Sequence, residues 1–306
     1  MLKKITIFLL TLFIIINAEE PRSFLIFGGK TGWMGQKVVK IIQDLGHVAI
    51  CAESRLENSS AMEAEIQSIM PDFIINAAGI TGRPNIDWCE QHKQETFEVN
   101  VVGTLNLVQL ATKYNIHLTN LTTGCLYTYD EKHPMGSGVG FTEEEKPNLF
   151  NSIYAKTKII LEDLLTEYPE VLNLRIKMPI STEFDKGFVG KIINFKKVVN
   201  FPNSLAVLDE LLPIAVDMTL KKVTGCFNFV NPGSLSHHEV LELYKEYVDP
   251  SHRYGCFTQD ELSKIPVRSN AVLSTSKLLK LYPNILPIRE SLIQLFKKIK
   301  MGLNPL

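Results

Sequence analysis

Residues 23–35 read SFLIFGGKTGWMG, and this stretch decides the fold. Its first five residues form a short apolar run typical of a buried parallel strand. Glycines follow at positions 28, 29, 32 and 35, and apolar residues at helical spacing run from Val38 to Leu45. A strand, a glycine turn and a helix in that order form the context in which a glycine fingerprint binds a dinucleotide.

Each glycine of the turn has its own expected role. Gly29 would permit the tight turn, Gly32 the close approach of backbone to a pyrophosphate, and Gly35 the packing of the helix against the strand. The pyrophosphate would then meet free N–H groups at the helix N-terminus. Glycines at this spacing also occur in purely structural turns, so the motif needs a second signal before it indicates a function.

From residue 21 onward, strand and helix patterns alternate, which predicts an α/β protein with a doubly wound parallel sheet of Rossmann type. After Pro179 the pattern is irregular and rich in prolines, which predicts a smaller C-terminal substrate lobe with segments that return to the sheet. We expect a signal-like segment at 1–20, an NAD(P)-binding domain at 21–178 and the substrate lobe at 179–306. The predicted strands cover 23–27, 47–52, 73–79, 118–123 and 171–177, and the predicted helices cover 61–70, 95–114 and 152–168.

Composition excludes several classes of function. The formal net charge is −1, so no basic surface for nucleic acid is expected. Five cysteines are an odd number, lie far apart and form no Cys-x-x-Cys pair, which predicts neither a metal site nor a disulfide framework.

Tyr154 and Lys158 provide the second signal. Spaced four residues apart in a predicted helix, they share one face. A tyrosine, with a pKa near ~10, is a poor proton donor at neutral pH, but a neighbouring ammonium would lower that pKa. In the reduction of a ketone, Tyr154 would give its proton to the carbonyl oxygen. Thr123, which we prefer over Thr122, ends a predicted strand and would hydrogen-bond the same oxygen. Two ordinary surface residues are the alternative; downstream of a glycine turn, however, the pair indicates a nicotinamide-dependent oxidoreductase of the short-chain dehydrogenase type.

Cofactor preference depends on the end of the second predicted strand, which reads Glu53-Ser54-Arg55. An arginine there would pair with the 2′-phosphate of NADPH, whereas an acidic residue would bind the ribose hydroxyl of NADH. We favour NADPH through Arg55 and keep NADH through Glu53 as the alternative. The small residues after the third predicted strand would lie against the adenosine half of the cofactor. The predicted cofactor-binding residues are Gly29, Thr31, Gly32, Trp33, Met34, Gly35, Arg55, Asn76, Ala77, Ala78 and Lys158.

Further motifs resemble those of the bifunctional nucleotide-rhamnose synthases, extended short-chain dehydrogenases related to dTDP-4-dehydrorhamnose reductase. Members of that family act as UDP-4-keto-6-deoxy-D-glucose 3,5-epimerases and 4-reductases. The resemblance covers about residues 22 to 295. It is carried by TGRPNIDWCE (81–90), TGC (123–125), HPMGSGVGF (133–141), MPIS (178–181), LLP (211–213), NPG (231–233) and RSN (268–270).

The resemblance implies a nucleotide-sugar substrate and a second set of site residues. Cys125 would be the base that removes protons from carbons 3 and 5, because a thiol beside a lysine becomes a workable base. Lys191 would be its partner on the sugar. Weaker substrate-binding candidates are Arg83 and Asn85 near the sugar or nicotinamide, Asn203 at the nucleotide and Arg268 at the diphosphate.

Two other functions stay open on sequence alone. One is a reductase of an already epimerised dTDP-4-keto sugar, in which Cys125 is merely structural. The other is a non-catalytic NAD(P)-binding subunit, against which the intact Tyr154 and Lys158 pair counts. The sequence decides neither between uridine and thymidine nor on the oligomeric state, for which a homodimer is one option.

The first residues form a different kind of segment. A positive start at Lys3 and Lys4 precedes an apolar run from Ile5 to Ile16, and Ala18 offers a cleavage site. The run is too short for an ordinary membrane span and suits the core of a signal peptide. A short anchor or an extension of a cytosolic enzyme is the alternative, and the predicted chemistry would suit the cytoplasm.

This segment can be tested by itself. A reporter fused behind residues 1–18 should enter the secretory pathway and lose about that segment, because a signal peptide is removed on translocation. Mass spectrometry of the reporter and its cell fraction measure both effects. An uncleaved reporter in the cytosol would contradict the prediction, and the same reporter without the segment is the control.

Overall fold

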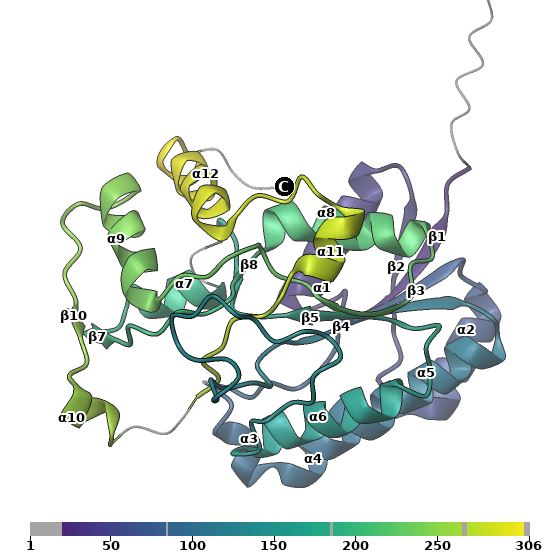
Figure 1. The fold of residues 1–306 in the computed structure, drawn as a ribbon. Coiled ribbons are helices and arrows are strands. Elements are labelled where there is room, and N and C mark those ends of the chain that lie inside the picture. Colours follow the sequence, from purple (N-terminus) through teal and green to yellow (C-terminus); the bar gives the residue numbers. More distant parts are fainter. Residues whose placement is uncertain (1–19, 84, 184–185, 265–267, 303–306) are drawn as a thin grey trace, which may run out of the picture.

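A computed structural model describes residues 20–83, 85–183, 186–264 and 268–302. The main sheet of this part has six strands, all parallel (Figure 1). Because β2 (Val48–Cys51) and β3 (Phe73–Asn76) lie on opposite sides of β1 (Ser23–Phe27), the strand order reverses between β1 and β3, which is where ligands bind in open parallel sheets. In spatial order the strands are β2 (Val48–Cys51), β1 (Ser23–Phe27), β3 (Phe73–Asn76), β4 (His117–Thr123), β5 (Leu172–Ile176) and β9 (Gly225–Asn228).

Helices cover both faces of the sheet (Figure 1). Alternate residues of β1 face opposite cores: Phe24 and Ile26 pack with α1 and α8, whereas Leu25 and Phe27 pack with α2, α5 and α6. Burial on both faces explains why this strand is a continuous apolar run. The flanking helices are α1 (Trp33–Asp44) and α8 (Leu208–Leu220) on one face, and α2 (Ser59–Ile69), α5 (Thr104–Lys113) and α6 (Ile153–Leu165) on the other.

The predicted long helix at 95–114 is divided in the structure. It consists of α4 (Lys93–Phe97), a π-helical segment η1 (Glu98–Gly103) and α5, with the short α3 (Trp88–Gln91) before it. The wider π turn has no signature in the apolar periodicity, so the sequence did not reveal it. Gly103 ends the π segment, where an added Cβ would lie 2.8 Å from the backbone of Leu56.

A third apolar core lies beside the end of the sheet, between α7 (Gly187–Ile192), α9 (His237–Tyr247) and α12 (Ile288–Lys300) (Figure 1). Ser236 caps α9 in a reciprocal box with Glu239, as its position before a helical pattern predicts. The domain boundary at 179 stays a prediction, although β9 comes from beyond it and pairs with β5. The smaller elements are β6 (Pro179–Ile180), β7 (Lys197–Val198), β8 (Ala206–Val207), β10 (Gly255–Cys256), α10 (Gln259–Leu262) and α11 (Ser276–Leu281).

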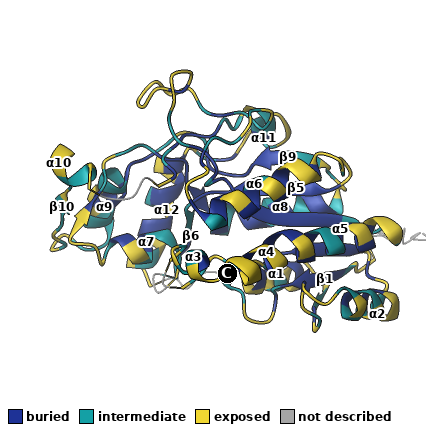
Figure 2. Cartoon of the chain, turned by 90° about the horizontal axis from the view of Figure 1, so that it is seen from below, coloured by how far each residue is buried: buried dark blue, intermediate teal, exposed yellow. Residues whose placement is uncertain are grey.

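Figure 2 shows the main sheet as a buried layer beneath helices whose outer sides are exposed. Among the helices in the described ranges, none combines the length and the apolar character needed to cross a membrane. The predicted signal segment at 1–18 lies outside the described residues.

Candidate active site

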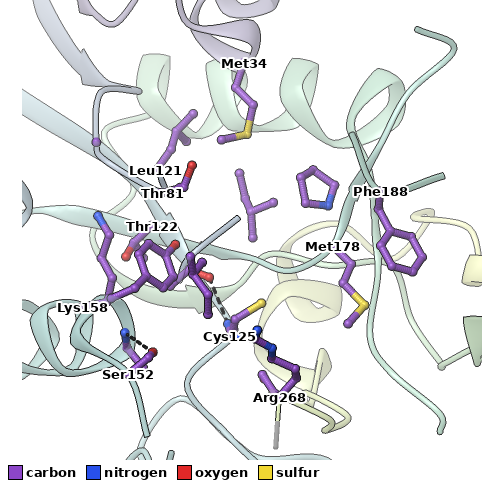
Figure 3. A pocket seen from close by; sticks show the side chains of 18 of the residues that line it. Met34, Thr81, Leu121, Thr122, Cys125, Ser152, Lys158, Met178, Phe188 and Arg268 are labelled. Carbon is purple, nitrogen blue, oxygen red and sulfur yellow. Dashed lines mark hydrogen bonds between the residues drawn. The ribbon is translucent and has the colours of Figure 1, made fainter. Parts of the chain in front are cut away.

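A cavity of about 500 Å³ opens at the carboxyl ends of the central strands, at the point where the strand order reverses. In Figure 3, Thr122 and Lys158 lie on one side, Met178 and Phe188 lie on the opposite side, and Cys125 and Arg268 lie between them. The cavity brings together ten of the predicted site residues: Trp33, Met34, Ala77, Ala78, Thr123, Cys125, Tyr154, Lys158, Lys191 and Arg268.

The glycine turn has the shape that a dinucleotide requires, with one correction to the predicted roles. The residue with left-handed backbone is Gly28, at φ +80°, and not Gly29. A Cβ at Gly32 would lie 2.6 Å from the carbonyl oxygen of Gly28, and one at Gly35 only 2.2 Å from it. Gly35 therefore allows α1 to pack on the turn, as predicted. Both consecutive glycines lie in the turn, as predicted for Gly29, but the left-handed position belongs to Gly28.

The start of α1 is free to receive an anion. Gly32 is its N-cap and has no side chain to occupy the first-turn N–H groups. No acidic residue stands in that first turn, and the exposed Thr31 precedes it. These features fit the pyrophosphate of a nicotinamide dinucleotide.

Asn76 serves a different purpose from the predicted cofactor contact. Its side chain is buried and donates to Asn120 Oδ1 at 2.9 Å, and Asn120 donates to Asn173 at 2.8 Å. Its own Oδ1 accepts from the backbone of Ala78 at 3.0 Å. Asn76 thus shapes the turn at Ala77 and Ala78, and these two residues line the cavity in its place.

Tyr154 and Lys158 enter the cavity from α6, whose N-cap Ser152 accepts from Ala155 N–H at 3.1 Å. Burial lowers the pKa of Lys158 to about 8, against an opposing effect of Glu162. Burial raises the pKa of Tyr154, and a hydrogen bond with Thr123 acts in the opposite direction. The pKa of Tyr154 therefore lies above its ordinary value, and not below it as expected, because desolvation of the phenolate dominates.

Cys125 lies beside this pair and is oriented by Thr123. The Thr123 hydroxyl accepts from the backbone N–H of Cys125 at 3.0 Å (dashed in Figure 3). The neighbouring Thr122 hydroxyl is buried and has no hydrogen-bond partner among the described residues, so it remains available to a ligand. Lys191 is an exposed residue that reaches the cavity from α7. The cavity thus presents a thiol and an amine in addition to the tyrosine and lysine of α6.

Trp33 links the glycine turn to the helix that carries Lys191. Gly187 begins α7 at φ +78°, and a Cβ there would lie 2.5 Å from the Trp33 ring. Trp33 Nε1 also donates to Glu183 Oε2 at 3.1 Å, and the buried Lys37 Nζ lies 2.7 Å from Glu183 Oε1. Trp33, which is predicted to contact the cofactor, therefore also connects the glycine turn with α7, the helix that carries Lys191.

Arg55 lies at the surface, outside the cavity. Its side chain is 75 % exposed, and its Nε lies 2.7 Å from Glu57 Oε1. Its competitor for the ribose, Glu53, forms an ion pair with Lys30 of the glycine turn. Ser54, between them, donates its backbone N–H and its hydroxyl to Glu65.

The four substrate-binding candidates have different surroundings. Arg268 lines the cavity and donates to both carboxylate oxygens of Asp87 at 2.9 Å. Arg83 and Asn85 are exposed and are not among the residues that line the cavity. The amide of Asn203 is buried and bonded to Phe201, Asn270 and Ala271, so protein contacts already use it.

Sequence reasoning missed Asn100 and Lys177. Asn100 is fully buried in η1, and its amide bonds the backbone of Ile80 in both directions at 2.9 Å. It fixes the loop in which Gly79 faces the Lys158 ammonium. Lys177 is fully buried just after β5. A lysine as the last residue of the predicted strand at 171–177 was the available signal.

All five cysteines are free. In the part of the chain that the structure describes, no group of three or more His, Cys, Asp or Glu residues could hold a metal ion. The cavity lining includes Cys125, Tyr154, Lys158 and Lys191, side chains that can exchange protons.

The glycine turn, the switch-point cavity and the Tyr154 and Lys158 pair define a nicotinamide-dependent enzyme of the extended short-chain dehydrogenase type. Residues 25–184 match the NAD dependent epimerase/dehydratase family, and the chain belongs to that family.

Relatives confirm the resemblance predicted from the sequence. The bifunctional dTDP-4-dehydrorhamnose 3,5-epimerase/dTDP-4-dehydrorhamnose reductase of Arabidopsis thaliana is 45% identical over 91% of this chain and 93% of its own. A trifunctional UDP-glucose 4,6-dehydratase/UDP-4-keto-6-deoxy-D-glucose 3,5-epimerase/UDP-4-keto-L-rhamnose-reductase of the same plant is 47% identical over 90% of this chain. The match covers 42% of that relative, so this chain spans less than half its length.

Solved structures agree with this assignment. The UDP-rhamnose synthase of Acanthamoeba polyphaga mimivirus superposes with a TM-score of 0.85 at 37% identity, over 91% of this chain and 99% of its own. A dTDP-4-dehydrorhamnose reductase of Bacillus anthracis, solved with NADP, has a TM-score of 0.76 at 17% identity, over 90% of this chain and 98% of its own. The second likeness shows the fold alone.

Proposed function

We propose that the protein is a nucleotide-sugar 3,5-epimerase and NAD(P)H-dependent 4-keto reductase. It would convert UDP- or dTDP-4-keto-6-deoxy-D-glucose into the nucleotide-linked L-rhamnose. One observation carries the proposal: a single cavity holds both the reductase pair, Tyr154 and Lys158, and the epimerase pair, Cys125 and Lys191. A simple reductase needs only the first pair.

Reduction uses the residues of α6 and the end of β4. When bound, the dinucleotide supplies a hydride to carbon 4 of the ketone. Tyr154 donates its proton to the carbonyl oxygen, which Thr123 also holds. Lys158, with a pKa lowered to about 8, is charged at neutral pH and stabilises the phenolate that forms.

Epimerisation uses the same carbonyl oxygen in another way. The 4-ketone acidifies the hydrogens on carbons 3 and 5, and the Cys125 thiolate removes one of them while the electron pair moves into an enolate. Thr123 and Tyr154 are placed to stabilise the enolate oxygen. Lys191 returns a proton to the same carbon from the α7 side. The configuration at that carbon is inverted, and the composition of the sugar does not change.

The nucleotide half of the substrate would extend past Arg268 at the wall of the cavity. Arg268 is placed to bind its diphosphate, because a guanidinium pairs with phosphate oxygens as it does with the carboxylate of Asp87. The relatives that act on nucleotide sugars support such a partner.

NADPH is the proposed cofactor, with NADH as the alternative. Arg55 follows the end of β2, where a 2′-phosphate would lie, and its exposed guanidinium would exchange Glu57 for that phosphate. The ion pair of Glu53 with Lys30 occupies the carboxylate that would otherwise bind a ribose hydroxyl. Both features favour a phosphorylated ribose.

A homodimer is proposed through the α4–α6 face, defined by Phe97, Val102, Ile153 and Ile160. These residues line one groove, and Phe97, Val102 and Ile160 are more than 40 % exposed. Lys93, Glu98 and Lys156 border the same groove, and charges of both signs suit contact with a second copy. A patch of this kind on a protein surface marks a contact site.

The segment at 1–18 is proposed to direct the chain into the secretory pathway. Its positive start and short apolar run support this proposal, and the reporter fusion described above tests it.

The two chemistries can be separated in deuterated water. Given UDP-4-keto-6-deoxyglucose and NADPH, the protein should form rhamnose labelled at carbons 3 and 5, as read by mass spectrometry and NMR. Tyr154→Phe should lose reduction and weaken exchange. Cys125→Ala should lose exchange by ~10²–10⁴-fold yet still reduce a pre-epimerised ketone. Cys256→Ala, at an exposed cysteine, is the matched control.

Normal epimerisation by Cys125→Ala would mean that the thiol is structural. Unlabelled product, or no product from the unepimerised sugar, would contradict the proposed function and favour the simple reductase.

Cofactor preference depends on one exposed side chain. Arg55→Ala should raise the KM for NADPH by about tenfold, the effect of losing a charge-assisted hydrogen bond, and should leave the KM for NADH unchanged. Steady-state kinetics with both cofactors measure this difference. Arg289→Ala removes a comparable exposed arginine that is paired with Glu239, and it should change neither value. Equal effects of Arg55→Ala on both cofactors would refute the assignment.

The proposed dimer contact through the α4–α6 face can be tested with one substitution. Ile160→Asp places a charge in the centre of the face and should convert a dimer into a monomer, because the carboxylate would be buried on association. Light scattering after size-exclusion chromatography reports the mass. Leu45→Asp, at an exposed leucine on another face, should remain a dimer. A wild-type monomer at micromolar concentration would rule out this interface.

A further inference from the structure

The sequence motif at 81–90 contains two carboxylates that the proposed mechanism does not use, Asp87 and Glu90. They stand at opposite ends of one short helical turn, since Asp87 is the N-cap of α3 and Glu90 lies within its last residues. Asp87 pairs with Arg268 at the cavity wall, and the two side chains of that pair are 60 % and 44 % exposed. An exposed ion pair of this kind contributes little to stability, so the stronger contact of the motif must be sought at its other end.

Glu90 contacts the helix that carries the reductase pair. Its Oε1 accepts from the backbone N–H of Ile153, the first residue of α6, at 2.7 Å. Glu90 is partly buried, and the neighbouring Cys89 is fully buried, which seats α3 against the interior. The carboxylate is thereby held at the point where α6 begins.

This contact satisfies a group that a helix cannot satisfy by itself. The first N–H groups of a helix have no acceptor within it. The N-cap Ser152 accepts from Ala155, and Glu90 accepts from Ile153, which directly precedes Tyr154. A carboxylate at this end of a helix also interacts favourably with the helix dipole. The start of α6 is therefore held by one local side chain and by one from a segment 63 residues away.

We propose that Glu90 is a positioning residue for Tyr154, because its bond to Ile153 fixes the first turn of α6 against α3. The role rests on the proposed function, in which Tyr154 gives its proton to the ketone and stabilises the enolate. Tyr154 is buried and lines the cavity, so its place relative to a bound ketone depends on where α6 begins. A displacement of about 1 Å between reacting groups can lower a rate by about 10²-fold.

The contact can be tested on the full chain without substrate. In the wild-type protein the amide of Ile153 should exchange slowly in deuterated water, although the first N–H groups of a helix ordinarily lack protection. Glu90→Ala should speed this exchange by about tenfold or more, the effect of losing a charge-assisted hydrogen bond. Glu90→Gln should keep it slow, because the amide oxygen accepts the same bond. Mass spectrometry with fragmentation to single residues measures the rate.

The kinetics of the same variants separate positioning from a general loss of structure. With NADPH and a pre-epimerised ketone, Glu90→Ala should lower kcat by about tenfold and change the KM for the ketone by less than about threefold. Glu90→Gln should restore kcat to within about threefold of the wild type. Glu95→Ala, at an exposed glutamate of α4, is the matched control and should behave as the wild type in both measurements.

Three results would overturn the proposal: a fast-exchanging Ile153 amide in the wild type, a wild-type kcat in folded Glu90→Ala, or no rescue by Glu90→Gln. If Glu90→Ala does not fold, the Ile153 amide in the wild type and in Glu90→Gln decides. Failure of the proposed function would appear as a wild type that reduces no ketone, and the amide measurement would still test the contact of Glu90 with α6.

Discussion

The site depends on how closely the turn after β1 approaches the start of α1. The carbonyl oxygen of Gly28 lies where side chains at positions 32 and 35 would be, so the turn exists only with glycines there. Gly28 also packs against the backbone of Ala77 after β3, where its own Cβ would lie 2.9 Å away. This contact brings the ends of β1 and β3 together and leaves the first-turn N–H groups of α1 facing the cavity.

Burial sets the acid–base character of the cavity. Lys158 and Lys177 are both nearly inaccessible, and desolvation lowers the pKa of each. The same desolvation raises the pKa of Tyr154, so the tyrosine remains protonated and can donate. A buried lysine beside a protonated tyrosine suits the proposed reactions, in which negative charge develops on a phenolate or an enolate.

The cofactor side and the sugar side are connected through Trp33. Its ring packs on Gly187 at the start of α7, and its indole N–H bonds Glu183, which also pairs with Lys37. The residue that follows the glycine turn thereby fixes the helix that carries Lys191. In the proposed function, hydride transfer and proton exchange act on one ketone, and this connection would keep both sets of residues in register with it.

The sequence by itself determined the sheet, the glycine turn and the pair on α6. These are local features, because strand periodicity, glycine spacing and a four-residue interval are each visible within a short window. The predicted ends of strands and helices mostly agree with the structure within a few residues. The π segment at 98–103 is the exception, because the apolar periodicity does not reveal it. Cys125 and Lys191 came from resemblance to a family, not from the pattern of residues.

Only the tertiary structure decided which polar residues face the cavity. Asn76 and Asn203 satisfy their amides within the protein, although both types of side chain commonly bind ligands. Lys177 read as the end of a strand, yet packing buries it fully and directs its ammonium to the hydroxyl and carbonyl of Ser269. The effect of a charge depends on its burial and on partners distant in sequence, and these are set only when the chain has folded.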